Sequence, residues 1–210
     1  MKKLFIANWK MALSHDVACT WLDQELPALH SAIGHTEHEL IICPSFTVLP
    51  YAVARFPDYD WGAQDCSFAQ LGAYTGDVSA ESLQQLDITY TIIGHSERRN
   101  YHGETNEQVA QKAAQLIEHA IIPIICIGER EKQDEIESIL RTQLEHIIPL
   151  YNHDTPLYVA YEPVWAIGTG SVIPSNELST ASAIIKKLCG PRQVRILYGG
   201  SVQIGRASCR

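Results

Sequence analysis

Short apolar runs rich in β-branched residues alternate with longer stretches of helical periodicity along almost the whole chain. The predicted strands cover residues 3–8, 39–43, 60–63, 88–93, 121–127, 157–161 and 194–198. The predicted helices cover residues 16–33, 46–55, 80–85, 106–119, 131–148 and 176–188, with Thr105 and Ser175 as N-caps of the fourth and the sixth. Strict alternation of this kind predicts an α/β fold with a parallel sheet and right-handed crossovers.

Two parallel architectures compete for this pattern, an open doubly wound sheet and a closed (β/α)8 barrel. A dinucleotide-binding open sheet carries a GxGxxG turn after its first strand, but Asn8-Trp9-Lys10-Met11 occupies that place here. The barrel is therefore favoured. A barrel of this type usually has about 250 residues and eight strands. The chain has 210 residues and seven predicted strands, so we expect a barrel that lacks the eighth βα unit.

Composition excludes several classes of partner. Lys and Arg total 16 against 24 Asp and Glu, giving a net charge of −8 that disfavours nucleic acid and anionic membranes. No apolar run approaches the roughly 18 residues of a membrane span. The cysteines at positions 19, 43, 66, 126, 189 and 209 show neither CxxC pairing nor metal-ligand spacing. They predict reduced thiols in a cytoplasmic protein without a metal site.

Polar and glycine residues follow four of the predicted strands at their carboxyl ends. They are Asn8 and Lys10 after the first strand, His95 and Glu97 after the fourth, Glu162 after the sixth, and Gly199, Gly200 and Ser201 after the seventh. Because barrel active sites lie at the carboxyl ends of the strands, we expect these residues to share one rim. Such a collection suits a small anionic substrate.

The segments FIANWKM, IIGHSERR, AYEPVWAIGTG and LYGGSV resemble those of the triosephosphate isomerase family. The resemblance extends from residue 3 to about residue 202, and HSERR and YEPVWAIGTG are long, specific matches. It implies a TIM barrel that interconverts dihydroxyacetone phosphate and D-glyceraldehyde 3-phosphate, in glycolysis and gluconeogenesis. It also implies a cytoplasmic enzyme that requires no metal or organic cofactor.

The resemblance assigns a role to each matched residue. Glu162 resembles the base that moves a proton between C1 and C2, and His95 the neutral imidazole that donates to the carbonyl oxygen. Lys10 matches the residue that supplies a fixed positive charge toward the oxyanion and the phosphate. Asn8 matches a residue that orients the substrate, and Glu97 matches a residue next to the catalytic groups. The substrate phosphate is assigned to Gly168, Ser201, Gly199 and Gly200. The mobile lid is assigned to Pro163, Val164, Trp165, Ala166, Ile167, Gly168, Thr169 and Gly170.

A long connection over residues 64–77 follows the third predicted strand. In the family this loop docks into a neighbouring subunit, and Thr75 matches the residue that approaches the partner's site. The resemblance therefore implies a two-fold homodimer.

The resemblance ends near residue 202, where the family continues with a further helix and strand. Residues 203–210 resemble an in-frame translation of a sequencing adapter, so we expect a non-native tail there and a single incomplete barrel domain over residues 1–202. Two other functions remain open at this point. One is a different sugar-phosphate enzyme such as an aldolase, although no predicted strand centre carries its lysine. The other is a catalytically inactive, truncated fragment.

Overall fold

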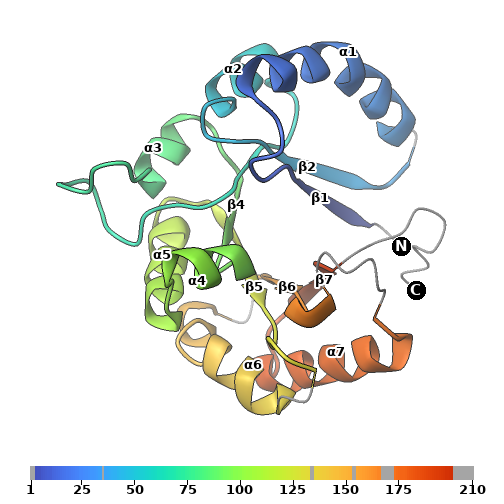
Figure 1. Cartoon of the computed structure of the whole chain (residues 1–210), viewed down its shortest axis with the longest axis vertical. Helices are drawn as coiled ribbons and strands as arrows, with labels where there is room; N and C mark the ends of the chain where they lie inside the picture. The colour runs from blue at the N-terminus through green and yellow to red at the C-terminus, as the bar shows by residue number, and fades with distance from the viewer. Residues whose placement is uncertain (1–2, 35, 133–134, 153–154, 167–172, 201–210) are drawn as a thin grey trace. The chain divides into compact units, whose positions relative to one another are not determined.

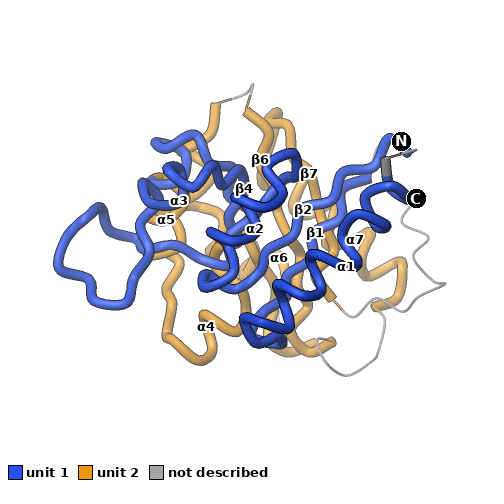
Figure 2. The backbone as a smooth tube through the Cα atoms, turned by 90° about the horizontal axis from the view of Figure 1, so that it is seen from above, with its two compact units in different colours: residues 1–92, 115–123 blue, residues 93–114, 124–210 orange. Residues whose placement is uncertain are grey.

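The computed structural model describes residues 3–34, 36–132, 135–152, 155–166 and 173–200. It divides into two compact units (Figure 2). The first unit comprises residues 1–92 and 115–123, and the second comprises residues 93–114 and 124–210. The chain passes from one unit to the other within β4, within α5 and within β5.

The first unit is built on two parallel strand pairs. Strand β1 (Leu4–Asn8) pairs with β2 (Glu39–Cys43), and β3 (Gly62–Ala63) pairs with the start of β4 (Tyr90–Ile93). A bridge from Ile42 to Trp61 connects β2 to the residue before β3. Helices α1 (His15–Gly34) and α2 (Leu49–Arg55) lie on one side of the β1–β2 pair, and α3 (Ala80–Gln85) precedes β4 (Figure 1).

The second unit contains a parallel sheet in the order β5 (Ile122–Ile127), β6 (Leu157–Tyr161), β7 (Val194–Tyr198). Helix α4 (Ser96–His102) follows β4, α5 (Asn106–Glu118) precedes β5, and α6 (Ile136–Leu144) follows β5. Helix α7 (Ser175–Cys189) packs against β7 and against α6. Short 3-10 turns precede and follow β6, at Ile148–Leu150 and Val164–Ala166.

Burial explains why the strands read as apolar runs. All residues of β6 are buried, and so are all residues of β5 except Ile122. Parallel strands covered on both faces have no solvent face on which polar residues could alternate. Charged side chains therefore follow these strands at their carboxyl ends and do not interrupt them.

Within the described residues the seven predicted strands are confirmed in number and order, with the third reduced to Gly62–Ala63. The helix predicted over 46–55 begins only at Leu49, with Pro50 in its first turn, where a missing N–H costs nothing. The helix predicted over 131–148 was too long. Helix α6 begins at Ile136 and ends at Leu144, and Pro149 lies in the 3-10 turn that follows. Helix α4 was not among the six predicted helices.

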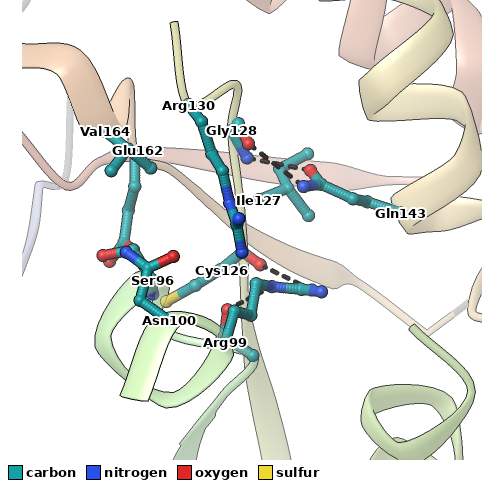
Figure 3. Close-up of a pocket in the computed structure, with 11 residues that line it drawn as sticks. Ser96, Arg99, Asn100, Cys126, Ile127, Gly128, Arg130, Gln143, Glu162 and Val164 are labelled. Carbon is teal, nitrogen blue, oxygen red and sulfur yellow. Dashed lines mark hydrogen bonds between the residues drawn. The ribbon is translucent and has the colours of Figure 1, made fainter. Parts of the chain in front are cut away.

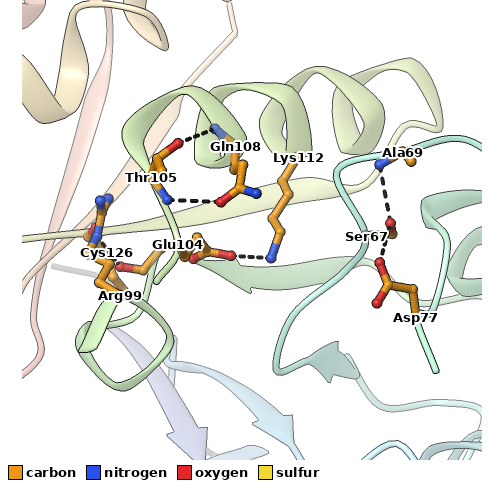
Figure 4. Close-up of polar contacts among 10 residues, drawn as sticks. Ser67, Ala69, Asp77, Arg99, Glu104, Thr105, Gln108, Lys112 and Cys126 are labelled. Atoms are coloured by element: carbon orange, nitrogen blue, oxygen red, sulfur yellow. Dashed lines mark hydrogen bonds and ion pairs between the residues drawn. The ribbon is translucent and has the colours of Figure 1, made fainter. Parts of the chain in front are cut away.

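The two predicted N-caps had different outcomes. Thr105 is confirmed, because its hydroxyl accepts from the Gln108 N–H at 3.3 Å while the Gln108 amide oxygen accepts from the Thr105 N–H at 3.0 Å (Figure 4). Ser175 is wrong as a cap. Pro174 occupies the N-cap position and Ser175 is the first residue of α7.

No helix among the described residues has the length and apolar character needed to cross a bilayer.

Candidate active site

Glu162 follows β6 directly and is 5% exposed. Its Oε2 accepts a hydrogen bond from the Ser96 N–H at 3.1 Å, and its Oε1 lies 3.4 Å from Nε2 of His95. The Cys126 thiol also hydrogen-bonds this carboxylate. Burial, together with the charge of Glu162, raises the pKa of the Cys126 thiol well above its ordinary value. The thiol is therefore a neutral donor beside Glu162.

His95 is held in one orientation by the start of α4, of which it is the N-cap. Its Nδ1 accepts from the Glu97 N–H at 3.2 Å. In a neutral imidazole an accepting Nδ1 leaves the proton on Nε2, the nitrogen that faces Glu162. The Glu97 carboxylate stays 3.6 Å from Nδ1, and its side chain is 46% exposed, so the backbone bond decides the tautomer. The pair can therefore offer one acid hydrogen and one basic oxygen side by side.

Two glycines allow the backbone to pass close to Glu162. A Cβ built on Gly199 would lie 2.7 Å from Cγ and 3.2 Å from Oε1 of Glu162. A Cβ on Gly128 would overlap the Glu162 carbonyl oxygen. Gly199 also donates its N–H to the Tyr161 carbonyl at 2.8 Å. Both positions thus require glycine for close approach, because any larger side chain would displace the carboxylate-bearing residue.

The first part of the predicted lid is anchored on Glu129. Its carboxylate accepts from the Tyr161 hydroxyl at 2.9 Å and from the Trp165 indole N–H at 2.7 Å, and its carbonyl accepts from the Val164 N–H at 3.0 Å. Burial, and then the charge of Glu129, raise the pKa of Tyr161 above its usual value, so its hydroxyl stays protonated and able to donate. Lys132 lies 4.8 Å from the centre of the Trp165 ring.

A small cavity of about 30 Å³ lies beside Glu162 (Figure 3). Its lining includes Ser96, Arg99, Cys126 and Gln143. Arg99 donates to the Gly94 carbonyl at 2.7 Å, and burial lowers the pKa of its guanidinium. A buried water needs roughly 10–15 Å³ of cavity volume, so this cavity has room for about two waters.

Asn8, Lys10 and Gln64 belong to the first unit. The Asn8 Oδ1 accepts from the Lys10 N–H at 3.0 Å, and the Gln64 amide donates to the Lys10 carbonyl at 2.9 Å. These bonds hold Lys10 in a left-handed backbone conformation, with φ of 52°, which is costly for a residue with a side chain. Backbone strain of this kind persists only where surrounding contacts hold the residue in place.

The sequence matches one protein family over nearly its whole length. The sequence pattern of the family described as triosephosphate isomerase covers residues 3–209. The triosephosphate isomerase of Thermus thermophilus is 41% identical over 222 aligned positions, which cover 96% of this chain and 85% of that protein. The one from Gloeobacter violaceus is 38% identical over 205 positions, with 96% and 84% covered, and the one from Magnetococcus marinus is 39% identical over 220 positions, with 97% and 86% covered.

The chain belongs to the triosephosphate isomerase family. Membership confirms the predicted TIM-barrel fold class, and the parallel strands and intervening helices of the two units agree with it. It also confirms the prediction of an isomerase. Neither the aldolase nor the inactive fragment is favoured. The family match continues to residue 209, into the segment predicted as a non-native tail, and that tail stays a prediction.

The triosephosphate isomerase motifs fall into two sets in the structure. His95, Glu97, Glu162 and Gly199 come together in the second unit, with Gly200 following. Asn8, Lys10 and the exposed Thr75 belong to the first unit. Five predicted site residues lie outside the described residues: Ile167, Gly168, Thr169, Gly170 and Ser201.

Sequence reasoning missed residues that touch or support the site, among them Ser96, Cys126 and Glu129. Glu129 carried a usable signal, because it follows β5 at the same strand end that supplied the other predictions. Ser96 and Cys126 carried none, since one acts through its backbone N–H and the other resembles an ordinary core cysteine. Across the described ranges, no group of three or more His, Cys, Asp or Glu side chains is placed to hold a metal ion.

Proposed function

We propose that Glu162 and His95 carry out the isomerisation of a triose phosphate as a base and an acid. The observation that supports this assignment is the 3.4 Å approach of His95 Nε2 to Glu162 Oε1 in a setting where both residues are less than one-tenth exposed. Glu162 takes the C1 proton of dihydroxyacetone phosphate, and the electron pair moves to form an enediolate. The C2 oxygen gains the Nε2 proton of His95 and the C1 hydroxyl returns a proton to that nitrogen. The carboxylic acid then delivers its proton to C2, which gives D-glyceraldehyde 3-phosphate, the original carboxylate and the original imidazole.

In this proposal His95 acts on oxygen while Glu162 acts on carbon. Its Nε2–H donates to the substrate carbonyl as negative charge develops there, and the Nδ1 bond from Glu97 keeps the proton on Nε2. A neutral imidazole suits this role, because it can donate to the oxyanion and be restored within one turnover.

The remaining predicted residues serve charge and binding. Lys10 supplies a positive charge toward the oxyanion and phosphate, and Asn8 orients the substrate and holds Lys10 through its backbone. The phosphate is bound by backbone N–H groups of Gly168, Gly199, Gly200 and Ser201, where glycine permits close approach. The lid of residues 163–170 closes over the substrate from its anchor on Glu129.

We further propose that the chain works as a cytoplasmic homodimer and that residues 1–202 form one domain. The support is the family membership together with a preformed loop over residues 64–77. The Ser67 hydroxyl donates to Asp77 at 2.7 Å within this loop (Figure 4), and Thr75 is exposed. A single cooperative unfolding transition is expected for one domain.

Isomerase assays in both directions test the catalytic assignment. Glu162→Asp withdraws the carboxylate by one methylene, so we expect turnover to fall by roughly a hundredfold or more while KM changes little. Glu25→Asp, an exposed carboxylate on α1, is the matched control and should leave turnover unchanged. Parent-like turnover in Glu162→Asp would remove Glu162 as the base.

Sedimentation of Thr75→Arg tests the dimer. We expect this variant to lose dimer content and activity together, while Thr20→Arg on the exposed side of α1 loses neither. An intact, fully active Thr75→Arg dimer would contradict the assignment of loop 64–77 as the interface.

A further inference from the structure

Gln143 makes a reciprocal pair of hydrogen bonds with the backbone N–H and carbonyl of one residue, Gly128, just after β5. Its Oε1 accepts from the Gly128 N–H at 2.9 Å, and its Nε2 donates to the Gly128 carbonyl at 3.0 Å (Figure 3). The two residues are 15 apart in the sequence, and the side chain reaches from α6 to the residue after β5. Because the amide group is planar, two bonds to the same residue fix both the position and the rotation of the Gly128 backbone.

Gly128 in turn supports the backbone of Glu162. On one side of Gly128, the Ile127 carbonyl accepts from the Glu162 N–H at 2.7 Å. On the other side, the Glu129 carbonyl accepts from the Val164 N–H at 3.0 Å. Gly128 lies between these two bonds, and its Cα is so close to Glu162 that a Cβ would overlap the Glu162 carbonyl oxygen. A shift of the Gly128 peptide is therefore transmitted directly to Glu162.

A cavity beside this contact means that losing the two Gln143 bonds would leave room for the Gly128 backbone to move. The cavity of about 30 Å³ beside Glu162 is lined by Gln143, Gly128 and Val164, among others. Without the two amide bonds, a water could enter and pair with the Gly128 N–H and carbonyl in more than one arrangement. The Gly128 peptide would then lose its single position.

We propose that Gln143 is a positioning residue for catalysis, which holds the Glu162 carboxylate in place through Gly128. This inference rests on the proposed role of Glu162 as the base. Gln143 touches no reacting atom. It acts because proton abstraction from carbon depends steeply on the placement of the base.

Three variants test the proposal. Gln143→Met keeps the length of the side chain and removes both bonds. Gln143→Glu keeps the acceptor for the Gly128 N–H, but when ionised it has no hydrogen to donate to the Gly128 carbonyl. Arg141→Gln is the control, because it lies on the same helix with its side chain paired to Glu137. The readouts are kcat, KM and hydrogen exchange at the Glu162 amide, which does not require activity.

We expect Gln143→Met to lose roughly ten- to a hundredfold in kcat with KM within about threefold of the parent, because the base is displaced and not the binding groups. Exchange at the Glu162 amide should speed up in Gln143→Met and stay at the parent rate in Arg141→Gln. For Gln143→Glu, the ratio of its kcat to that of the parent should increase as the pH is lowered from about 8 to about 5. The protonated carboxyl regains the missing donor.

A Gln143→Met variant with the kcat and the Glu162 amide exchange of Arg141→Gln would overturn the positioning role. A variant that raises KM with kcat unchanged would also overturn it, because that pattern marks a binding contact. Glu162→Gln, measured in the same series, separates this failure from failure of the proposed function. If Glu162→Gln keeps parent turnover, the base assignment itself is wrong.

Discussion

Gly199→Ala tests how closely the chain must approach the proposed base. The added methyl carbon would lie 2.7 Å from Cγ of Glu162, whereas two carbons in contact prefer about 3.5–4.0 Å. Something must therefore move by about 1 Å. The backbone of Gly199 is joined to Tyr161 by a hydrogen bond of 2.8 Å, so the side chain of Glu162 is the part that can give way.

A displacement of this size is expected to cost roughly a hundredfold in turnover, because catalytic geometry tolerates an error of 1 Å poorly. Gly199 does not have the left-handed φ that penalises alanine, so the loss of folding stability should be modest. We therefore expect kcat to fall far more than the melting temperature.

The assay is steady-state kinetics combined with thermal unfolding, in a double-mutant cycle with Glu162→Asp. If the methyl acts through the Glu162 side chain, Gly199→Ala should cost much less turnover in the shorter Asp background. Equal costs in both backgrounds, or parent-like turnover in Gly199→Ala, would refute the reasoning.

Three further outcomes follow from other parts of the structure. His95→Gln should lower kcat far more than it raises KM, because the bond to oxygen strengthens only as charge develops; a change confined to KM would contradict this role. Lys112→Met should lower the free energy of unfolding, measured by urea titration, by about 3–5 kcal/mol. The substitution leaves the buried Glu104 carboxylate without its ion-pair partner (Figure 4). A loss near zero would contradict this prediction. Burial raises the pKa of Cys43 from 9.0 to about 12, so the folded state holds this proton more tightly than the unfolded chain. The contribution of Cys43 to the free energy of unfolding is therefore fully present below about pH 9 and is lost as the pH rises toward 12. Cys43→Ala should make this alkaline loss of stability smaller in unfolding curves.

The strands were predictable because burial on both faces removes polar residues from them. β5 and β6 therefore read as continuous apolar runs, with boundaries close to those observed. The helix boundaries were harder. Pro50 and Pro149 mark places where a local turn replaces part of the helical pattern, and periodicity alone does not detect this.

The candidate site was predictable to the extent that strand ends carry it. Glu162 and His95 follow two strands, and the structure brings their side chains within 3.4 Å. Ser96 and Gln143 could not be predicted, because their importance comes from contacts with residues 66 and 15 positions away. Such contacts depend on how the strand ends pack, which no local pattern encodes.

The most direct test of the central claim is hydrogen exchange between solvent and substrate carbon. The chain is incubated with dihydroxyacetone phosphate in deuterium oxide, and deuterium on carbon is followed by NMR. Proton transfer through Glu162 predicts carbon-bound deuterium at C1 of recovered substrate and C2 of product for the parent chain. It predicts almost none for Glu162→Gln over the same time, since that side chain has no basic oxygen. Deuterium incorporation by Glu162→Gln at the parent rate would contradict the account.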